Sequence, residues 1–319
     1  MKSTLSKYQE YLEHCNLCGS GEHSILHHYP EGFYNHKAFI TYPWDGGVMA
    51  PLTIVKCNGC GLIFQNPRFK AEHLNMIYTD SVMDTIDLES EVKHHKFKPL
   101  LSLIESKAKS NVQSPLSMDI GTRFGLLPEL LRRMGYDSHG IEFNSIVVDS
   151  ATQNGFKNVH LGTIDTIGDI MNRLGKQRIH LITMTDVIEH LYDPTRDFSA
   201  LARFQECGDH MVIQTMNAGS LGYRLFGSWW YYIHAQHTFY FDESMMRRLL
   251  DRHGYDITYI LKVAPWKNIT MIRKVWKEFK LHKKERIRRN QSAHMGDKVW
   301  YASGKPTLFD IFTVVARKR

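Results

Sequence analysis

Four of the five cysteines form two Cys-x-x-Cys pairs near the N-terminus, Cys15 with Cys18 and Cys57 with Cys60. Four thiolates at this spacing are typical of a tetrahedral structural zinc site. Two disulfides would need an oxidising compartment, and a redox-active pair would need an adjoining strand and helix that the sequence lacks here. Because cysteine fills all four ligand positions, none is left for a catalytic water. We therefore predict a structural zinc ion.

A second group of residues could bind a nucleoside. A short apolar run is followed by a glycine turn at 121–125, a helix-like stretch at 126–134 and a short strand that ends in Glu142. Glycines allow the backbone to approach a ligand closely, and a helix N-terminus favours a negative group. A carboxylate at the end of the second strand can accept hydrogen bonds from both hydroxyls of a ribose. This order of elements predicts a nucleoside-binding crevice.

A third group could handle a proton or a metal ion. Asp186, Glu189 and His190 directly follow an expected strand at 178–184. In open α/β sheets, ligands bind at the carboxyl ends of the strands. Residues three apart share a helix face, so Asp186 and Glu189 are expected to converge, with His190 beside them. Carboxylates and imidazoles placed in this way can remove a proton from a hydroxyl or hold a divalent ion.

The elements that must position these groups alternate along the chain. From Leu116 onward, short apolar strands and helices follow one another, which favours a Rossmann-like doubly wound α/β fold with a parallel sheet. We expect a zinc-ribbon module over residues 1–70 and a helical connector over 71–115, with its best helix at 97–110. The main domain is expected over 116–319, with a basic helical insertion at 266–305 before its last strand.

Composition narrows the class of protein. The 319 residues are 43% hydrophobic and 23% charged, as in ordinary globular enzymes. We find no apolar run long enough to span a membrane and no signal peptide, so we expect a cytoplasmic location. The net charge of +7 is concentrated at 266–290, a segment that contains ten Lys or Arg residues and two Glu residues. The rest of the chain is close to neutral, which argues against an extended nucleic-acid-binding surface.

Two further segments could meet a substrate. Residues 219–241 are rich in aromatic side chains, which stack well on a sugar or another ring, although residues 229–232 could instead pack as core. The basic segment at 266–290 has three interpretations: a solvated face, a patch for an anionic substrate such as a nucleotide diphosphate, or a helix in peripheral contact with a membrane.

Taken together, these features resemble a class I S-adenosylmethionine-dependent methyltransferase. More narrowly, the chain is similar to the zinc-ribbon branch found in bacterial surface-polysaccharide and deoxysugar gene clusters. The resemblance covers residues 15 to about 262 in order. It is carried by CGLIFQNPR at 60–68, DIGTRFG at 119–125, GIE at 140–142, DVIEHLYDP at 186–194, TMN at 215–217 and HTFYF at 237–241.

The resemblance implies a seven-stranded sheet and a set of cofactor contacts. Gly121 and Gly125 would wrap the methionine part of S-adenosylmethionine, and Glu142 would hold its ribose. The rest of the expected cofactor-binding set is Asp119, Arg123, Phe143, Thr163, Ile164, Asp165 and Asp186, of which the three residues 163–165 would lie against the adenine.

The sequence departs from the family in the glycine turn, where Arg123 replaces the usual central glycine. Its side chain could point away from the ligand, pair with the cofactor carboxylate, or block the pocket. Because a blocked pocket would abolish binding, a non-catalytic zinc-ribbon binding protein remains an alternative interpretation.

For the chemistry, we expect O-methylation of a sugar hydroxyl, on a nucleotide sugar or surface glycan in polysaccharide biosynthesis. His237 or His190 would act as the general base. Alternatively, Asp186, Glu189, His190 and His237 would hold a catalytic divalent metal, a spacing similar to the metal site of small-RNA 2′-O-methyltransferases. Glu189 and His190 could also serve only as caps and core hydrogen-bonding groups. RNA or a small aromatic metabolite is the alternative substrate.

Overall fold

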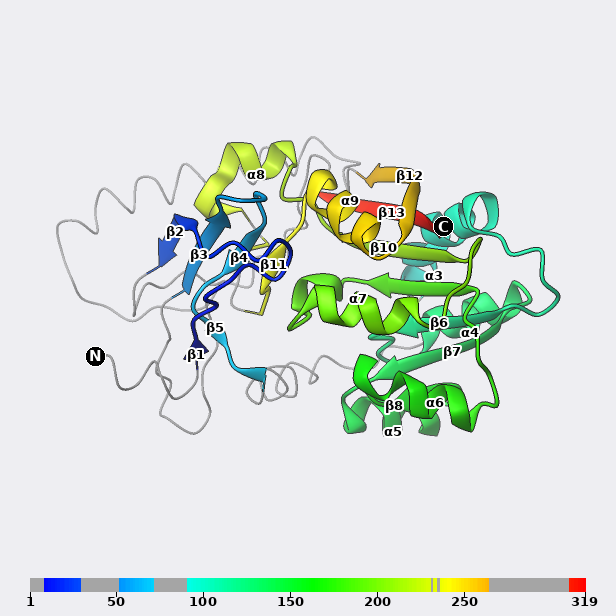
Figure 1. Ribbon diagram of the computed structural model, residues 1–319. Helices are drawn as coiled ribbons and strands as arrows, with labels where there is room; N and C mark the ends of the chain where they lie inside the picture. The colour runs from blue at the N-terminus through cyan, green and yellow to red at the C-terminus, as the bar shows by residue number, and fades with distance from the viewer. Residues whose placement is uncertain (1–8, 30–51, 72–90, 231, 234–235, 264–309) are drawn as a thin grey trace.

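The computed structural model describes residues 9–29, 52–71, 91–230, 232–233, 236–263 and 310–319 (Figure 1). Its main sheet has seven strands, in the order β12-β13-β10-β9-β6-β7-β8. These strands are β6 (Leu116–Ile120), β7 (Asp137–Glu142), β8 (Val159–Leu161), β9 (Leu181–Thr185), β10 (His210–Met216), β12 (Tyr255–Val263) and β13 (Ile311–Lys318). The expected seven-stranded α/β fold is confirmed.

One strand departs from the expected parallel arrangement. β6, β7, β8, β9 and β10 pair in parallel, but β13 lies between β10 and β12 and runs antiparallel to both. Antiparallel neighbours need no crossover helix, so β13 can return directly alongside β12. The register pairs Val263 with Ile311. Both ends of the intervening segment therefore lie at the carboxyl end of β12, the edge at which the predicted site residues follow their strands.

Helices cover both faces of this sheet, as a doubly wound fold requires. Buried side chains of α3 and α4 pack on one face, and those of α6, α7 and α9 pack on the other. The helices are α3 (Glu91–Lys107), α4 (Leu126–Arg133), α5 (Ser145–Gln153), α6 (Ile167–Arg173), α7 (Pro194–Ala202), α8 (Leu221–Phe226) and α9 (Glu243–Arg252). The expected helix at 97–110 forms, but it begins earlier and ends at Lys107.

A second, four-stranded sheet combines the N-terminal region with a distant segment. Its order is β11-β4-β3-β2, from β2 (His23–Tyr29), β3 (Leu52–Cys57), β4 (Ile63–Gln65) and β11 (Phe239–Tyr240). A further two-stranded sheet pairs β1 (Gln9–Glu10) with β5 (Arg68–Phe69). Figure 1 shows β11 alongside the N-terminal strands. Phe64 and Phe239 belong to the same buried cluster as the α9 side of the main sheet, so the two regions share one core.

The basic segment at 266–290 and the whole insertion at 266–305 lie outside the described residues. Among the residues that are described, no helix has the length and apolar character needed to cross a bilayer.

Candidate functional site

The four predicted zinc ligands come together. The Sγ atoms of Cys15 and Cys60 are 3.7 Å apart and those of Cys18 and Cys57 are 3.5 Å apart. All four sulfurs lie within 4.8 Å of one another. Zinc–thiolate bonds of about 2.3 Å in a tetrahedron place sulfurs roughly 3.8 Å apart, so the donor set fits this ion. The fifth cysteine, Cys207, is exposed and lies outside the cluster.

Replacing Cys57 with serine is expected to abolish zinc binding, because a structural site needs all four thiolates. The wild-type chain should carry about one zinc per chain by metal analysis. Cys207→Ser is the matched control, because its thiol is outside the cluster, and it should keep the full zinc content. Equal zinc contents in the two variants would contradict the assignment.

The glycine turn packs tightly between β6 and the loop after β9. Gly121 has a φ of +70°, and a Cβ added there would lie 2.5 Å from a methyl carbon of Val187. Only glycine therefore fits this close approach. Gly125 has a φ of +81° and precedes α4, whose first turn receives no side-chain cap. The N–H groups of this first turn would favour a negative group, as expected from the sequence.

Glu142 ends β7 and is 4% exposed. Its carboxylate accepts hydrogen bonds from the backbone N–H groups of Arg123, at 2.9 Å, and Asn144, at 3.1 Å. Burial raises the pKa of this carboxyl group. The backbone of Phe143 also hydrogen-bonds to this carboxylate. An ionised carboxylate has about four acceptor positions, so about one remains in number for a ribose hydroxyl. The residues present fit the nucleoside expected from the sequence.

Arg123 adopts a φ of +53°, in the left-handed region that favours glycine. Glycine is also the residue expected at this position from the family resemblance. Its side chain is exposed, and the guanidinium carbon lies 5.7 Å from the ring centre of Phe124. Its backbone N–H still serves Glu142. Because the side chain of Arg123 is exposed to solvent, it does not fill the space beside Glu142.

The other expected cofactor contacts lie in different environments. Asp119 is buried and accepts a 2.7 Å hydrogen bond from Thr183 on β9, and burial raises its pKa to about 7. It therefore ties β6 to β9. Thr163, Ile164 and Asp165 follow β8 in a short 3₁₀ turn, where Asp165 forms an ion pair with Arg196. Phe143 is half-buried.

The predicted catalytic residues converge only in part. Glu189, His190 and His237 form one group whose ligand atoms lie within 4.8 Å of one another. The two imidazole rings are 4.7 Å apart, centre to centre. Asp186 does not belong to this group; it is exposed and has a φ of +55°. The helix expected to bring its carboxylate beside Glu189 is replaced by a 3₁₀ turn that starts only at Ile188.

Hydrogen bonds fix the protonation pattern of this group. Nδ1 of His190 lies 2.9 Å from the carbonyl oxygen of Gln236, and Nδ1 of His237 lies 2.8 Å from that of Tyr232. A carbonyl can only accept, so each Nδ1 carries a proton, and in a neutral ring the lone pair is then on Nε2. Burial lowers the pKa of His190, which keeps its ring neutral at pH 7.

Glu189 is the acid of the group and is 2% exposed. One carboxylate oxygen accepts a 2.8 Å hydrogen bond from the hydroxyl of Thr215, at the end of β10. Burial, reinforced by the charge of Asp186, raises the pKa of Glu189 to about 8. A nearby cation would reverse this effect and favour the carboxylate.

The segment that follows the second cysteine pair contacts residues next to this group: Thr238, beside His237, and Tyr192, two residues after His190. The N–H of Gln65 donates to the carbonyl oxygen of Thr238 at 2.8 Å, and the N–H of Thr238 donates to that of Glu189 at the same distance. Arg68 donates to the carbonyl of Tyr192 and lies 3.6 Å from its ring centre. The motif at 60–68 is visible in the sequence, but its position against the segments that carry Glu189 and His237 is not.

The aromatic segment is partly core, as one interpretation of the sequence held. Trp230 is buried and donates from its indole N–H to Asp310 at 3.1 Å. Tyr29 of the N-terminal sheet donates to the carbonyl oxygen of Ser228. Tyr231 lies outside the described residues.

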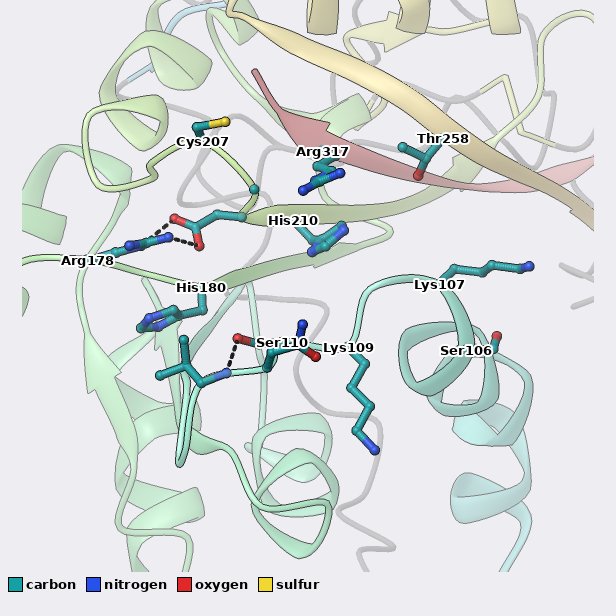
Figure 2. A pocket seen from close by; sticks show the side chains of 14 residues that line it. Ser106, Lys107, Lys109, Ser110, Arg178, His180, Cys207, His210, Thr258 and Arg317 are labelled. Atoms are coloured by element: carbon teal, nitrogen blue, oxygen red, sulfur yellow. Dashed lines mark hydrogen bonds and ion pairs between the residues drawn. The ribbon is translucent and has the colours of Figure 1, made fainter.

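A cavity of about 490 Å³ lies at the opposite edge of the main sheet (Figure 2). Its walls include His180 and His210, at the amino ends of β9 and β10, and Arg317 near the end of β13. Arg178, which also lines it, pairs with Asp209. The predicted site residues follow the carboxyl ends of the strands, so this cavity is separate from them.

Comparison with known proteins gives a family match. A family model described as a methyltransferase domain matches residues 92–260, just over half of the chain. The ubiquinone biosynthesis O-methyltransferase of Serratia proteamaculans is 26% identical over 134 residues, which is 41% of this chain. The match spans 55% of that relative's length.

Solved structures with a similar fold include two methyltransferases. An S-adenosylmethionine-dependent methyltransferase from Archaeoglobus fulgidus is 15% identical, with a TM-score of 0.46, over 76% of this chain and 99% of that chain. The magnesium protoporphyrin IX methyltransferase of Synechocystis, solved with bound SAH, is 14% identical, with a TM-score of 0.45, over 78% of this chain and 94% of that chain.

Proposed function

We propose that this chain, which belongs to the family of S-adenosylmethionine-dependent methyltransferases, methylates a hydroxyl group of a sugar on a nucleotide sugar or surface glycan. The observation that carries the proposal is the group of Glu189, His190 and His237, gathered at the carboxyl edge of the sheet. O-methylation requires a proton acceptor beside the reacting hydroxyl, and this group supplies two imidazoles whose Nδ1 atoms are held by backbone carbonyls.

The cofactor would supply an electrophilic methyl group on a sulfonium ion. Glu142 and the glycine turn would hold its nucleoside, as their geometry allows. Nε2 of His237 would take the proton of the acceptor hydroxyl as the new O–CH₃ bond forms. The carbonyl of Tyr232 holds the opposite ring nitrogen and so keeps the lone pair on Nε2. His190, packed against His237, limits the positions that the ring can adopt.

A divalent metal at the same group is the second candidate mechanism. Histidines that ligate metals commonly donate their other N–H to a backbone carbonyl, which orients the ring. His190 and His237 both do so. Together with the Glu189 carboxylate they offer three ligand atoms of the types that divalent ions accept. A bound metal would lower the pKa of an acceptor hydroxyl and reduce the need for a protein base.

Several observations favour an anionic sugar substrate in the cytoplasm. The two described strands that flank the segment with the concentrated positive charge, β12 and β13, end at Val263 and begin at Ile311, both at the carboxyl edge of the sheet. A nucleotide diphosphate or a membrane-linked glycan would match that charge. A four-cysteine zinc site is typical of reduced compartments. RNA and small aromatic metabolites remain the alternative acceptors.

The test is turnover of labelled S-adenosylmethionine against a panel of UDP- and dTDP-linked hexoses. We expect at least one hexose to accept label, with a rate that changes little with salt. RNA methylation would instead fall steeply with salt, because phosphate contacts release counterions. Labelling of RNA or of a catechol, with none of the hexoses accepting label, would overturn the sugar assignment.

A further inference from the structure

The side chain of Gln65 is buried, and the residue is 1% exposed. Within the part of the chain that the structure describes, neither its amide nitrogen nor its amide oxygen has a hydrogen-bonding partner. Buried polar side-chain atoms in folded proteins nearly always have a partner, so each exception needs an explanation. A buried amide without a hydrogen-bonding partner lowers the stability of the chain, unless a bound ligand supplies the missing hydrogen bonds.

The strand register places this amide on the same face as Tyr240, whose ring lies near that of His237. β4 and β11 pair Ile63 with Tyr240 and Phe64 with Phe239. The bond from the Gln65 N–H to the Thr238 carbonyl continues this pairing by one residue. Side chains alternate along strands, so those of Gln65, Thr238 and Tyr240 lie on one face of the sheet. The Tyr240 ring on that face is 6.3 Å from the ring of His237, centre to centre.

A purely structural glutamine in the same chain has a different environment. Gln205 is also buried, at 5% exposed, but its amide nitrogen donates to the carbonyls of Ile179 and His210. Its amide oxygen accepts a 2.7 Å hydrogen bond from the hydroxyl of Tyr255. Gln205 is therefore satisfied by the fold, whereas the fold leaves both ends of Gln65 unsatisfied.

We propose that Gln65, a residue of the zinc-ribbon region, binds the methyl acceptor. A carboxamide offers two donors and an acceptor, which match neighbouring hydroxyls of a polyhydroxylated ring. The inference rests on the proposed function, because it places the acceptor beside His237. The N-terminal region would then supply a specificity-determining side chain to a site whose proton acceptor belongs to the main domain. An acceptor that lacks a hydroxyl at that place would leave the amide unpaired and bind less well.

The test compares two glutamine-to-leucine variants of the full-length chain. Gln65→Leu removes an unpaired buried amide, so its melting temperature should rise by about 2–4 °C. Its kcat/KM for the preferred hexose of the UDP- and dTDP-sugar panel should fall about 10- to 100-fold, mainly through KM. Its affinity for S-adenosylmethionine should stay within about twofold. The matched control, Gln205→Leu, should lower the melting temperature and leave the acceptor KM unchanged at temperatures where it is folded.

Two results would overturn the inference. A lower melting temperature for Gln65→Leu would show that the amide has a structural partner, such as an ordered water. An unchanged acceptor KM in a stabilised variant would show that the amide does not meet the acceptor. Failure of the sugar assignment looks different, because the wild-type chain itself would then turn over no hexose. The shifts in melting temperature need no acceptor, so they decide whether the amide is unpaired in either case.

Discussion

Replacing His237 with alanine is expected to lower kcat by about 10³-fold while the affinity for S-adenosylmethionine stays within about twofold. His237 is the group's only contribution from the segment before β11, and both candidate mechanisms use its Nε2. Single-turnover rates with labelled cofactor measure the loss, and titration calorimetry measures the affinity. His139→Ala is the control. His139 is buried to a similar degree, but it lies within β7, where its ring stacks on that of His160 in β8.

The same assay separates the two mechanisms. If His237 acts as a base, strict removal of divalent ions leaves the wild-type rate unchanged. If it ligates a metal, chelation lowers the rate, and adding a divalent ion restores it. Metal analysis must be made alongside, since the cysteine cluster is expected to hold an ion of its own. A His237→Ala variant with the wild-type rate would contradict both mechanisms.

Glu142→Ala is expected to weaken binding of S-adenosylmethionine by at least about 100-fold, because a site built to bond hydroxyls loses both acceptors at once. The backbone N–H groups of Arg123 and Asn144 would also lose their buried partner. Titration calorimetry measures the loss. Glu142→Gln keeps one acceptor oxygen and should give an intermediate affinity.

The control for this experiment is Glu129→Ala, on the first turn of α4. Glu129 is near the same glycine turn, but its carboxylate pairs only with exposed arginines, Arg132 and Arg133, within the helix. Cofactor affinity should be unchanged in this variant. Equal affinities in Glu142→Ala and the wild-type chain would remove the basis for the nucleoside crevice.

Local patterns were enough to predict most of the main sheet. The helix expected at 126–134 is α4, and the strand expected at 210–215 is β10. Both have apolar residues at the right period and stop signals at their ends, so tertiary contacts reinforce what the local sequence favours. The cysteine cluster was predictable for a similar reason, since the ligand types and spacing define the site.

Features that depend on distant pairing could not be predicted in this way. β11 has only two residues, Phe239 and Tyr240, and becomes a strand because β4 lies beside it. Asp186 stays outside the group of ligand atoms formed by Glu189, His190 and His237, because the prediction assumed an α-helix in a stretch that forms a 3₁₀ turn. No local signal marks Gln65 as unpaired, since pairing depends on what the folded chain places around it.

The pairing of β4 with β11 has a consequence for the growing chain. The cysteine knuckles and strands β2 to β4 are made early, but the strand that covers β4 follows only at Phe239. At about 5–20 residues per second, β4 would wait on the order of ten seconds with its edge open. Open strand edges recruit other chains. N-terminal fragments that stop before residue 239 are therefore expected to aggregate, even with zinc supplied.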